Sequence, residues 1–198
     1  MKVLKFGGTS VGTTENIKTL LKLVQEERKN ANPVVVLSAM SGVTNLLLEM
    51  AELAEKGENY QDQLKNIEQK HFDVVKALLP AAAQNPILTK LKIYFNELED
   101  ALQAVPSLKE LSLRTKDFIV SFGERCSNSM VAHIATQYFD NSLYVDGSKL
   151  IKTDSDFGNA RVDFSLTDAL IKEFYEENND KVLFVTGFIA SNKENQIT

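Results

Sequence analysis

The amino terminus combines a lysine, two glycines and two hydroxyl side chains in the sequence KFGGTS. Lys5 precedes Gly7 and Gly8, whose bare backbone amides let an anion approach closely, and Thr9 adds a hydroxyl donor. The segment has neither the G-x-x-x-x-G-K spacing of a Walker loop nor the G-x-G-x-x-G spacing of a dinucleotide fingerprint. It is typical of a phosphate-binding turn of another kind, and a tight turn with a solvated lysine is an equally open interpretation.

A second group of small polar residues, SAMSGVTN, follows the β-branched run Val34–Leu37. Because that run is typical of a buried parallel strand, Ser38 and its successors should lie at the carboxyl edge of a sheet, where ligands of α/β proteins bind. The helix that follows would favour negative charge at its amino terminus. The alternative is simple helix capping by Thr44 or Asn45.

Three later segments carry further candidates. Glu124 stands beside a glycine in an apolar helical stretch, where its carboxylate could receive a substrate ammonium group or simply pair with Arg125. Asp154 and Asp156 could face a ligand or a magnesium ion, but they lack the ligand number of a calcium loop and are more typical of a solvated loop. Phe188 follows the last predicted strand and would line the same sheet edge, or mark an ordinary strand terminus.

Composition and the remaining reactive residues exclude several classes of function. The formal net charge is −5 and there is no basic stripe, so we expect no nucleic-acid partner and no membrane partner. Cys126 is the single cysteine, which favours a reducing compartment and a soluble cytoplasmic protein, and it lacks an evident base partner. His71 and His133 lie on apolar helix faces without the neighbours of a zinc site, so we interpret both as packing residues.

Strands and helices alternate at both ends of the chain. The runs typical of strands are Lys2–Phe6, Val34–Leu37, Ser142–Val145 and Lys181–Thr186. Apolar residues recur at helical spacing after the first two runs, and Thr13 or Thr14 can cap the first helix. This order predicts an α/β fold, a three-layer α/β/α sandwich with a mostly parallel sheet.

The middle of the chain predicts a helical hairpin insert over about residues 60–105. Two apolar stripes at helical spacing run from Leu64 to Leu78 and from Leu88 to Leu102. Pro80 and Pro86 are expected to bracket the turn between them. We expect this hairpin to project from the sheet or to pack on its edge.

The second half of the sequence holds three further signals. The stretch from Ser112 to Phe139 predicts a helix with a break near Gly123. Ser165 can cap a later helix, because apolar residues follow it at helical spacing. The polar run from Ser191 to Gln196 is typical of the bend of a hairpin.

Taken together, these segments resemble the aspartate kinase family, within the larger amino-acid kinase fold. The segments KFGGTSVG, VVVLSAMSGVTNLL, SFGERCS, VDGSKLI, TDSDFGNA and VTGFIA occur in the family's order and span essentially the whole chain. The third departs from the usual pattern, because Cys126 and Asn128 stand where the family has a leucine and serines.

The resemblance implies roles for particular residues. The residues implied to bind the ATP phosphates are Lys5, Gly7, Gly8 and Thr9. Those implied to bind the substrate are Ser38, Thr44, Glu124 and Phe188. Among them, Thr44 would bind aspartate, Glu124 would hold its amino group, and Lys5 and Glu124 would be the catalytic residues. The implied cofactors are ATP and Mg²⁺, and no residue is implied to be a metal ligand.

The implied reaction transfers the γ-phosphoryl group of ATP to the β-carboxylate of L-aspartate, the first step of the Lys/Thr/Met biosynthetic pathway. Residues 1–198 would be an incomplete amino-acid kinase domain, inactive alone, because the family's G-R-G-G-S-D motif would follow Thr198. We expect a homo-oligomer for the full-length protein. The helical insert resembles those of lysine-sensitive and bifunctional enzymes, which leaves a homoserine dehydrogenase domain open. The alternatives are an amino-acid kinase with another acceptor, or a non-catalytic ligand-binding module.

Overall fold

A single parallel sheet of four strands organises the computed structural model, which describes residues 1–108 and 110–198. The strands are β1 (Val3–Phe6), β2 (Val34–Leu37), β3 (Ser142–Val145) and β4 (Val182–Thr186). Their order across the sheet is β1-β2-β4-β3, and every neighbouring pair is parallel. All four strands lie where the sequence predicted them.

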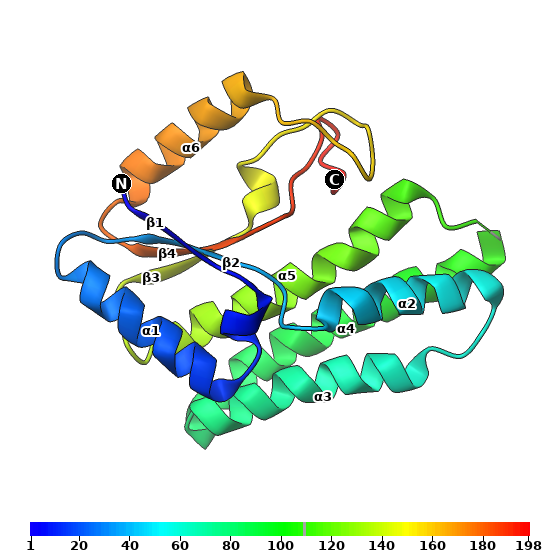
Figure 1. Ribbon diagram of the computed structural model, residues 1–198, viewed down its shortest axis with the longest axis horizontal. Helices are drawn as coiled ribbons and strands as arrows, with labels where there is room; N and C mark the ends of the chain where they lie inside the picture. The colour runs from blue at the N-terminus through cyan, green and yellow to red at the C-terminus, as the bar shows by residue number, and fades with distance from the viewer. Residues whose placement is uncertain (109) are drawn as a thin grey trace.

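Helices cover both faces of the sheet (Figure 1). Helix α6 (Phe164–Asn178) lies on one face, while α1 (Thr14–Arg28) and α5 (Leu113–Ala135) lie on the other. The predicted α/β fold is therefore confirmed. The two faces differ in burial, because Val35 and Leu37 of β2 are fully buried whereas the alternate residues of that strand are half-buried. We predicted a strand buried on both faces. Strand β2 is fully buried on the face toward α1 and α5 and half-buried on the other face.

Four helices pack together below the sheet in Figure 1. They are α5 and the three helices α2 (Val43–Lys56), α3 (Gln61–Leu78) and α4 (Ala81–Leu108). The predicted insert corresponds to α3 and α4, which pack against each other and against α2 and α5. The hairpin therefore packs mainly on other helices, and the expectation that it projects or lies on the sheet edge is wrong. The reason is that α2 and α5 also present apolar faces that need cover.

The turn between α3 and α4 is shorter than predicted. Only Leu79 and Pro80 separate the two helices, and Pro86 lies inside α4, so the prediction that Pro86 borders the turn is wrong. Pro86 is the sixth residue of α4, beyond the first four amides that have no intrahelical partner, so the proline costs the helix one hydrogen bond. Burial of Ile87 and Leu91 immediately after it outweighs this cost.

Helix α5 runs without a break through Gly123, contrary to the prediction. A Cβ atom at Gly123 would lie 2.8 Å from Ala39 Cβ and 3.2 Å from Leu47 Cδ1. The glycine therefore allows α5 to approach the loop after β2 closely, and this packing outweighs the weak helix propensity of glycine.

Side-chain caps fix the starts of α1 and α6. Thr13 caps α1 as predicted, because its hydroxyl accepts the Asn16 N–H at 3.2 Å. Asp163 caps α6, and its Oδ1 accepts the Leu166 N–H at 3.1 Å. The prediction that Ser165 caps this helix is wrong, because the aspartate two residues earlier supplies the oxygen that the first turn needs.

The end of the chain turns back on itself as predicted. Ala190 and Thr198 exchange backbone hydrogen bonds of 3.2 and 3.1 Å. The Asn192 side chain closes the turn by accepting the Glu194 and Gln196 amides at 3.1 and 2.9 Å. These bonds define a short hairpin beside the carboxyl end of β4.

His71 is a fully buried packing residue of α3, as the sequence predicted. Its Nδ1 lies 2.8 Å from the Ile67 carbonyl oxygen, and its ring packs edge-on against Phe95. Its Nε2 has no partner among residues 1–108 and 110–198. Burial lowers the pKa of His71 to about 4, so the imidazole is neutral in the folded protein at neutral pH.

We predict that the free energy of unfolding decreases as the pH is lowered, because of His71. The folded pKa lies below the unfolded value of about 6.5, so the contribution of neutral His71 is complete above pH 6.5 and is lost as the pH drops toward 4. The expected loss is about 2 kcal/mol at pH 5. Urea unfolding of wild type and His71→Phe at pH 7.5 and pH 5 measures it. Identical pH dependence in both proteins would contradict the prediction.

Candidate functional site

The carboxyl ends of all four strands meet at one edge of the sheet. Phe6 is paired with Leu37, and Leu37 with Thr186, so β1, β2 and β4 end level with one another. The Gly187 amide extends this alignment by donating to the Leu37 carbonyl at 2.8 Å. The segments after β1, β2 and β4 are therefore neighbours, as expected from their positions after parallel strands.

The glycine turn after β1 contacts the loop after β2 directly. The Ser41 amide donates to the Gly8 carbonyl at 3.1 Å, and a Cβ at Gly8 would lie 3.0 Å from the Ala39 carbonyl oxygen. Gly7 differs, because a Cβ there would meet nothing within 4 Å in the part of the chain that the structure describes. From α3, Lys70 Nζ donates to the Ser41 carbonyl at 2.5 Å. The helical hairpin thus also contacts this loop.

Lys5 occupies an exposed position in β1, one residue before the strand ends. It is paired with Val36 in the sheet, and its neighbours Leu4 and Phe6 face the core. Alternation along the strand places the Lys5 side chain on the opposite face from α5. Thr9 follows in the short helix η1 (Gly8–Val11) and lines a separate hollow of about 200 Å³.

Glu124 of α5 points its carboxylate at the loop after β2. The residue is only 4% exposed, and its Oε1 accepts the Ala39 N–H at 3.1 Å. Burial raises the pKa of the Glu124 carboxyl, while the Ala39 amide and the Ser38 hydroxyl oppose that shift. The structure therefore brings Glu124 and Ser38 together, and Thr44 follows in the first turn of α2.

We predict that both alanine and valine at position 123 destabilise the protein. The added Cβ would overlap Ala39, and overpacking of this kind reduces the free energy of unfolding by about 1–3 kcal/mol, with the larger loss for Gly123→Val. Denaturant unfolding checks the sign. If the glycine were only a weak point of the helix, Gly123→Ala would raise the stability by about 1 kcal/mol instead.

Asn128 is a site residue whose role sequence analysis missed. It is fully buried, and its Nδ2 donates to the Leu37 carbonyl at 3.1 Å and to the Glu124 carbonyl at 2.9 Å. The amide thus ties α5 to the end of β2, next to Ser38. Its departure from the family's pattern was the available signal. Cys126, two residues earlier, is also buried, and burial raises the pKa of its thiol, which disfavours a nucleophilic role.

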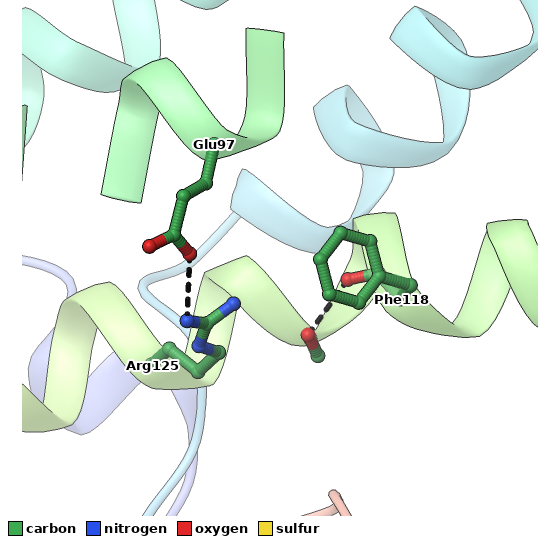
Figure 2. Close-up of polar contacts among 4 residues, drawn as sticks. Glu97, Phe118 and Arg125 are labelled. Carbon is green, nitrogen blue, oxygen red and sulfur yellow. Dashed lines mark hydrogen bonds and ion pairs between the residues drawn. The ribbon is translucent and has the colours of Figure 1, made fainter. Parts of the chain in front are cut away.

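Arg125 pairs with a residue of α4 and not with Glu124 (Figure 2). Its guanidinium donates to Glu97 Oε2 at 2.9 Å and stacks over the rings of Tyr94 and Phe122. The alternative that Glu124 serves only as the partner of Arg125 is therefore wrong, because the two side chains leave α5 in different directions. The second dashed line in Figure 2 ends on the carbonyl oxygen of Phe118, which accepts a hydroxyl hydrogen bond within α5.

A cavity of about 470 Å³ lies beside α5. Glu124 and Phe188 both line it, together with Asp117, and no lysine or arginine of the described chain does. Phe188 is 94% exposed and has a φ of 63°, which is uncommon for a residue other than glycine. The other predicted site residues do not line this cavity; they are Lys5, Gly7, Gly8, Thr9, Ser38 and Thr44.

The acidic segment after Thr153 is a closed loop. Asp154 Oδ1 accepts the Asp156 and Arg161 amides at 3.2 and 3.0 Å, and these bonds lower the pKa of Asp154. Within residues 1–108 and 110–198, no group of three or more acidic, histidine or cysteine side chains could hold a metal ion. For the carboxylates of Asp154 and Asp156, the solvated-loop interpretation therefore fits better than a ligand site.

Comparisons with known proteins identify the family to which the chain belongs. The model of the amino acid kinase family matches residues 1–198. The chain belongs to the amino acid kinase family. Among curated relatives of this family, Aspartokinase 1 of Arabidopsis thaliana is 34% identical over 196 residues, which are 95% of this chain and 33% of the relative. The bifunctional aspartokinase/homoserine dehydrogenase 1 of the same plant is 28% identical over 195 residues, 98% of this chain and 21% of the relative.

Solved structures of the family match the whole chain. E. coli aspartokinase III in complex with aspartate and ADP, in its R-state, has a TM-score of 0.88 and 28% identity, covering 100% of this chain and 43% of that chain. The same enzyme with lysine and aspartate, in its T-state, has a TM-score of 0.89, 27% identity and the same coverage. This chain therefore spans less than half of these relatives. None of the helices described here is long and apolar enough to cross a membrane.

Proposed function

We propose that the chain forms the acceptor-binding part of an aspartate kinase, which transfers the γ-phosphoryl group of ATP to the β-carboxylate of L-aspartate. The observation that carries the proposal is the loop after β2. On one side its Ala39 amide binds the Glu124 carboxylate, and on the other its Ser41 amide binds the Gly8 carbonyl. A single loop thus joins the candidate ammonium site to the candidate phosphate site.

The charges that line the cavity support the proposal that the acceptor carries a cationic group. Glu124 and Asp117 line it, and no described lysine or arginine does. An α-ammonium group would find a negative partner in Glu124, whose remaining oxygen is free of the Ala39 amide. The left-handed backbone of Phe188 at the rim adds support, since such conformations cluster at ligand sites. Because no described lysine or arginine lines the cavity, we expect the cations that bind the acceptor's carboxylates to come from elsewhere. Ser38 and Thr44 would donate hydroxyl hydrogen bonds to the acceptor.

The turn after β1 supports the ATP side of the proposal. A Cβ at Gly7 would meet nothing within 4 Å among the described residues, so the bare backbone there leaves room for an oxyanion. Lys5 adds a positive charge, and Thr9 follows in η1. Mg²⁺ would supply charge neutralisation on the phosphates. Lys5 and the Gly7 and Gly8 amides would hold those phosphates.

The chemistry needs positioning more than proton transfer. The β-carboxylate of aspartate has a pKa of about 3.9, so the nucleophile is ionised at neutral pH without a general base. The barrier comes from bringing an anion to a polyanion, and fixed donors and cations lower it. In this proposal Glu124 holds the amino group while Lys5 offsets the phosphate charge.

Homo-oligomerisation and a cytoplasmic location remain predictions of the same proposal.

An acceptor panel tests the proposed function. The complete gene product is incubated with MgATP and L-aspartate, L-glutamate, N-acetylglutamate or uridylate, and ADP release is followed by a coupled assay. Acyl phosphates are trapped as hydroxamates. We expect turnover and hydroxamate with aspartate and little with the others. Turnover with another acceptor, and none with aspartate, would replace the proposal with a different amino acid kinase.

A further inference from the structure

One wall of the cavity is a loop whose two arms are paired with each other at its base and whose tip is bonded to α5. This segment, residues 154–162, is called the Gly158 loop below. At its base, the Asp154 amide donates to the Arg161 carbonyl at 3.0 Å, and the Asp163 amide donates to the Lys152 carbonyl at 2.8 Å. At its tip, the Gly158 amide donates to Asp117 Oδ2 of α5 at 2.7 Å. The loop therefore extends from these paired residues at its base to α5 at its tip.

Gly158 is suited to this contact by its backbone. Its φ of 79° lies in the left-handed region, which glycine adopts without strain. A Cβ there would lie 3.5 Å from Leu113 Cδ2, which is ordinary contact, so the glycine is required for its conformation and not for space. The conformation directs the Gly158 amide at the carboxylate of Asp117.

Asp117 lies on the face of α5 that lines the cavity. Asp117, Ser121 and Glu124 follow one another at i, i+4 and i+7, which places them on one side of a helix, and all three line the cavity. Burial raises the pKa of the Asp117 carboxyl, and the Gly158 amide opposes the shift. Ser121 directs its hydroxyl to the Phe118 carbonyl at 2.7 Å, so Asp117 is the member of this stripe that bonds the loop.

We propose that Asp117 is a positioning residue, which latches the tip of the Gly158 loop to α5 and thereby completes the wall of the acceptor cavity. The part of this inference that concerns the acceptor rests on the proposed function. The latch itself rests only on the contact between Asp117 and Gly158. Because the loop contributes Gly158, Asn159, Ala160 and Val162 to the cavity that Glu124 also lines, release of its tip would loosen this part of the cavity wall.

Hydrogen exchange at the Gly158 amide tests the latch without reference to catalysis. The complete gene product is compared with Asp117→Ala, with Asp117→Asn and with Asp168→Asn, an acidic position on α6 away from the cavity. We expect exchange at Gly158 to become at least tenfold faster in Asp117→Ala and less so in Asp117→Asn, whose amide oxygen can still accept. Asp168→Asn should match wild type. Unchanged exchange in Asp117→Ala, with a melting temperature near that of wild type, overturns the latch. If Asp117→Ala does not fold, the isosteric Asp117→Asn decides by the same measure.

Steady-state kinetics of the same variants test the link to the acceptor. We expect the KM for the acceptor to rise at least fivefold in Asp117→Ala, with the KM for ATP within twofold of wild type and partial rescue in Asp117→Asn. Faster exchange together with an unchanged acceptor KM overturns the role in the cavity. If wild type has no kinase activity, the proposed function fails, and the exchange result alone then supports or overturns the latch.

Discussion

Replacing Lys5 with alanine should lower the kcat of the complete gene product at least tenfold at saturating ATP. The physical reason is that Lys5 is an exposed cation at the end of β1, beside the Gly7–Gly8 turn that we propose to hold the phosphates. Its removal leaves the charge that develops on the phosphoryl group with one fewer neutralising partner. A coupled assay at saturating aspartate and ATP measures the change.

Lys2→Ala is the matched control for this substitution. Lys2 precedes β1 at the opposite end of the strand, and its ammonium pairs with Glu27 of α1. The control should keep kcat within twofold of wild type, since its charge lies at the amino edge of the sheet. Full turnover in Lys5→Ala would remove Lys5 from the mechanism, whatever the control shows.

Glu124→Gln should raise the KM for aspartate by roughly 30- to 150-fold while leaving the KM for ATP nearly unchanged. A hydrogen bond to a charged partner is worth about 2–3 kcal/mol when its partner stays buried, which corresponds to that range. Glutamine keeps the volume of the side chain, and its carbonyl oxygen can still accept the Ala39 amide. The fold should therefore persist, and steady-state kinetics with each substrate varied measures the effect.

Glu97→Gln serves as the control for Glu124→Gln. Glu97 lies on α4 and pairs with Arg125, the residue next to Glu124, so the variant disturbs the neighbouring ion pair without touching the cavity carboxylate. The aspartate KM should stay within twofold of wild type. An equal rise in both variants would show that local packing of α5, and not the Glu124 carboxylate, sets the affinity.

Much of the fold follows from local signals in the sequence. The β-branched run of β2 and the threonine at position 13 predict a buried strand and a helix start, and both are found. Because all the strands are parallel, their order alone also predicts that the glycine turn and the loop after β2 share an edge. The hydrogen bond between Ser41 and Gly8 bears this out.

The errors come from positions where packing between distant segments outweighs local propensity. Gly123 breaks no helix because Ala39 fills the space that its missing side chain leaves. Pro86 lies within a helix because the apolar stripe of α4 is buried on the bundle. The helix α6 is capped by Asp163 and not by Ser165. Aspartate and serine both serve as caps, so the sequence does not tell which of these two close positions precedes the helix.

Two contacts at the site could not have been predicted from one sequence. Asp117 and Gly158 are 41 positions apart, and Asn128 and Leu37 are 91 positions apart. Neither pair carries a local pattern, because each depends on how α5 packs beside the sheet. Glu124 was identified through its neighbouring glycine and through family resemblance, whereas its bond to the Ala39 amide required the structure.

The most direct test of the account is a crystal structure of the complete gene product with L-aspartate and a non-hydrolysable ATP analogue. The account predicts the aspartate ammonium group at about 3 Å from the Glu124 carboxylate, with the β-carboxylate directed toward the terminal phosphate beside Lys5 and Gly8. Aspartate bound with its ammonium group away from Glu124, or phosphates bound at another edge of the sheet, would contradict it.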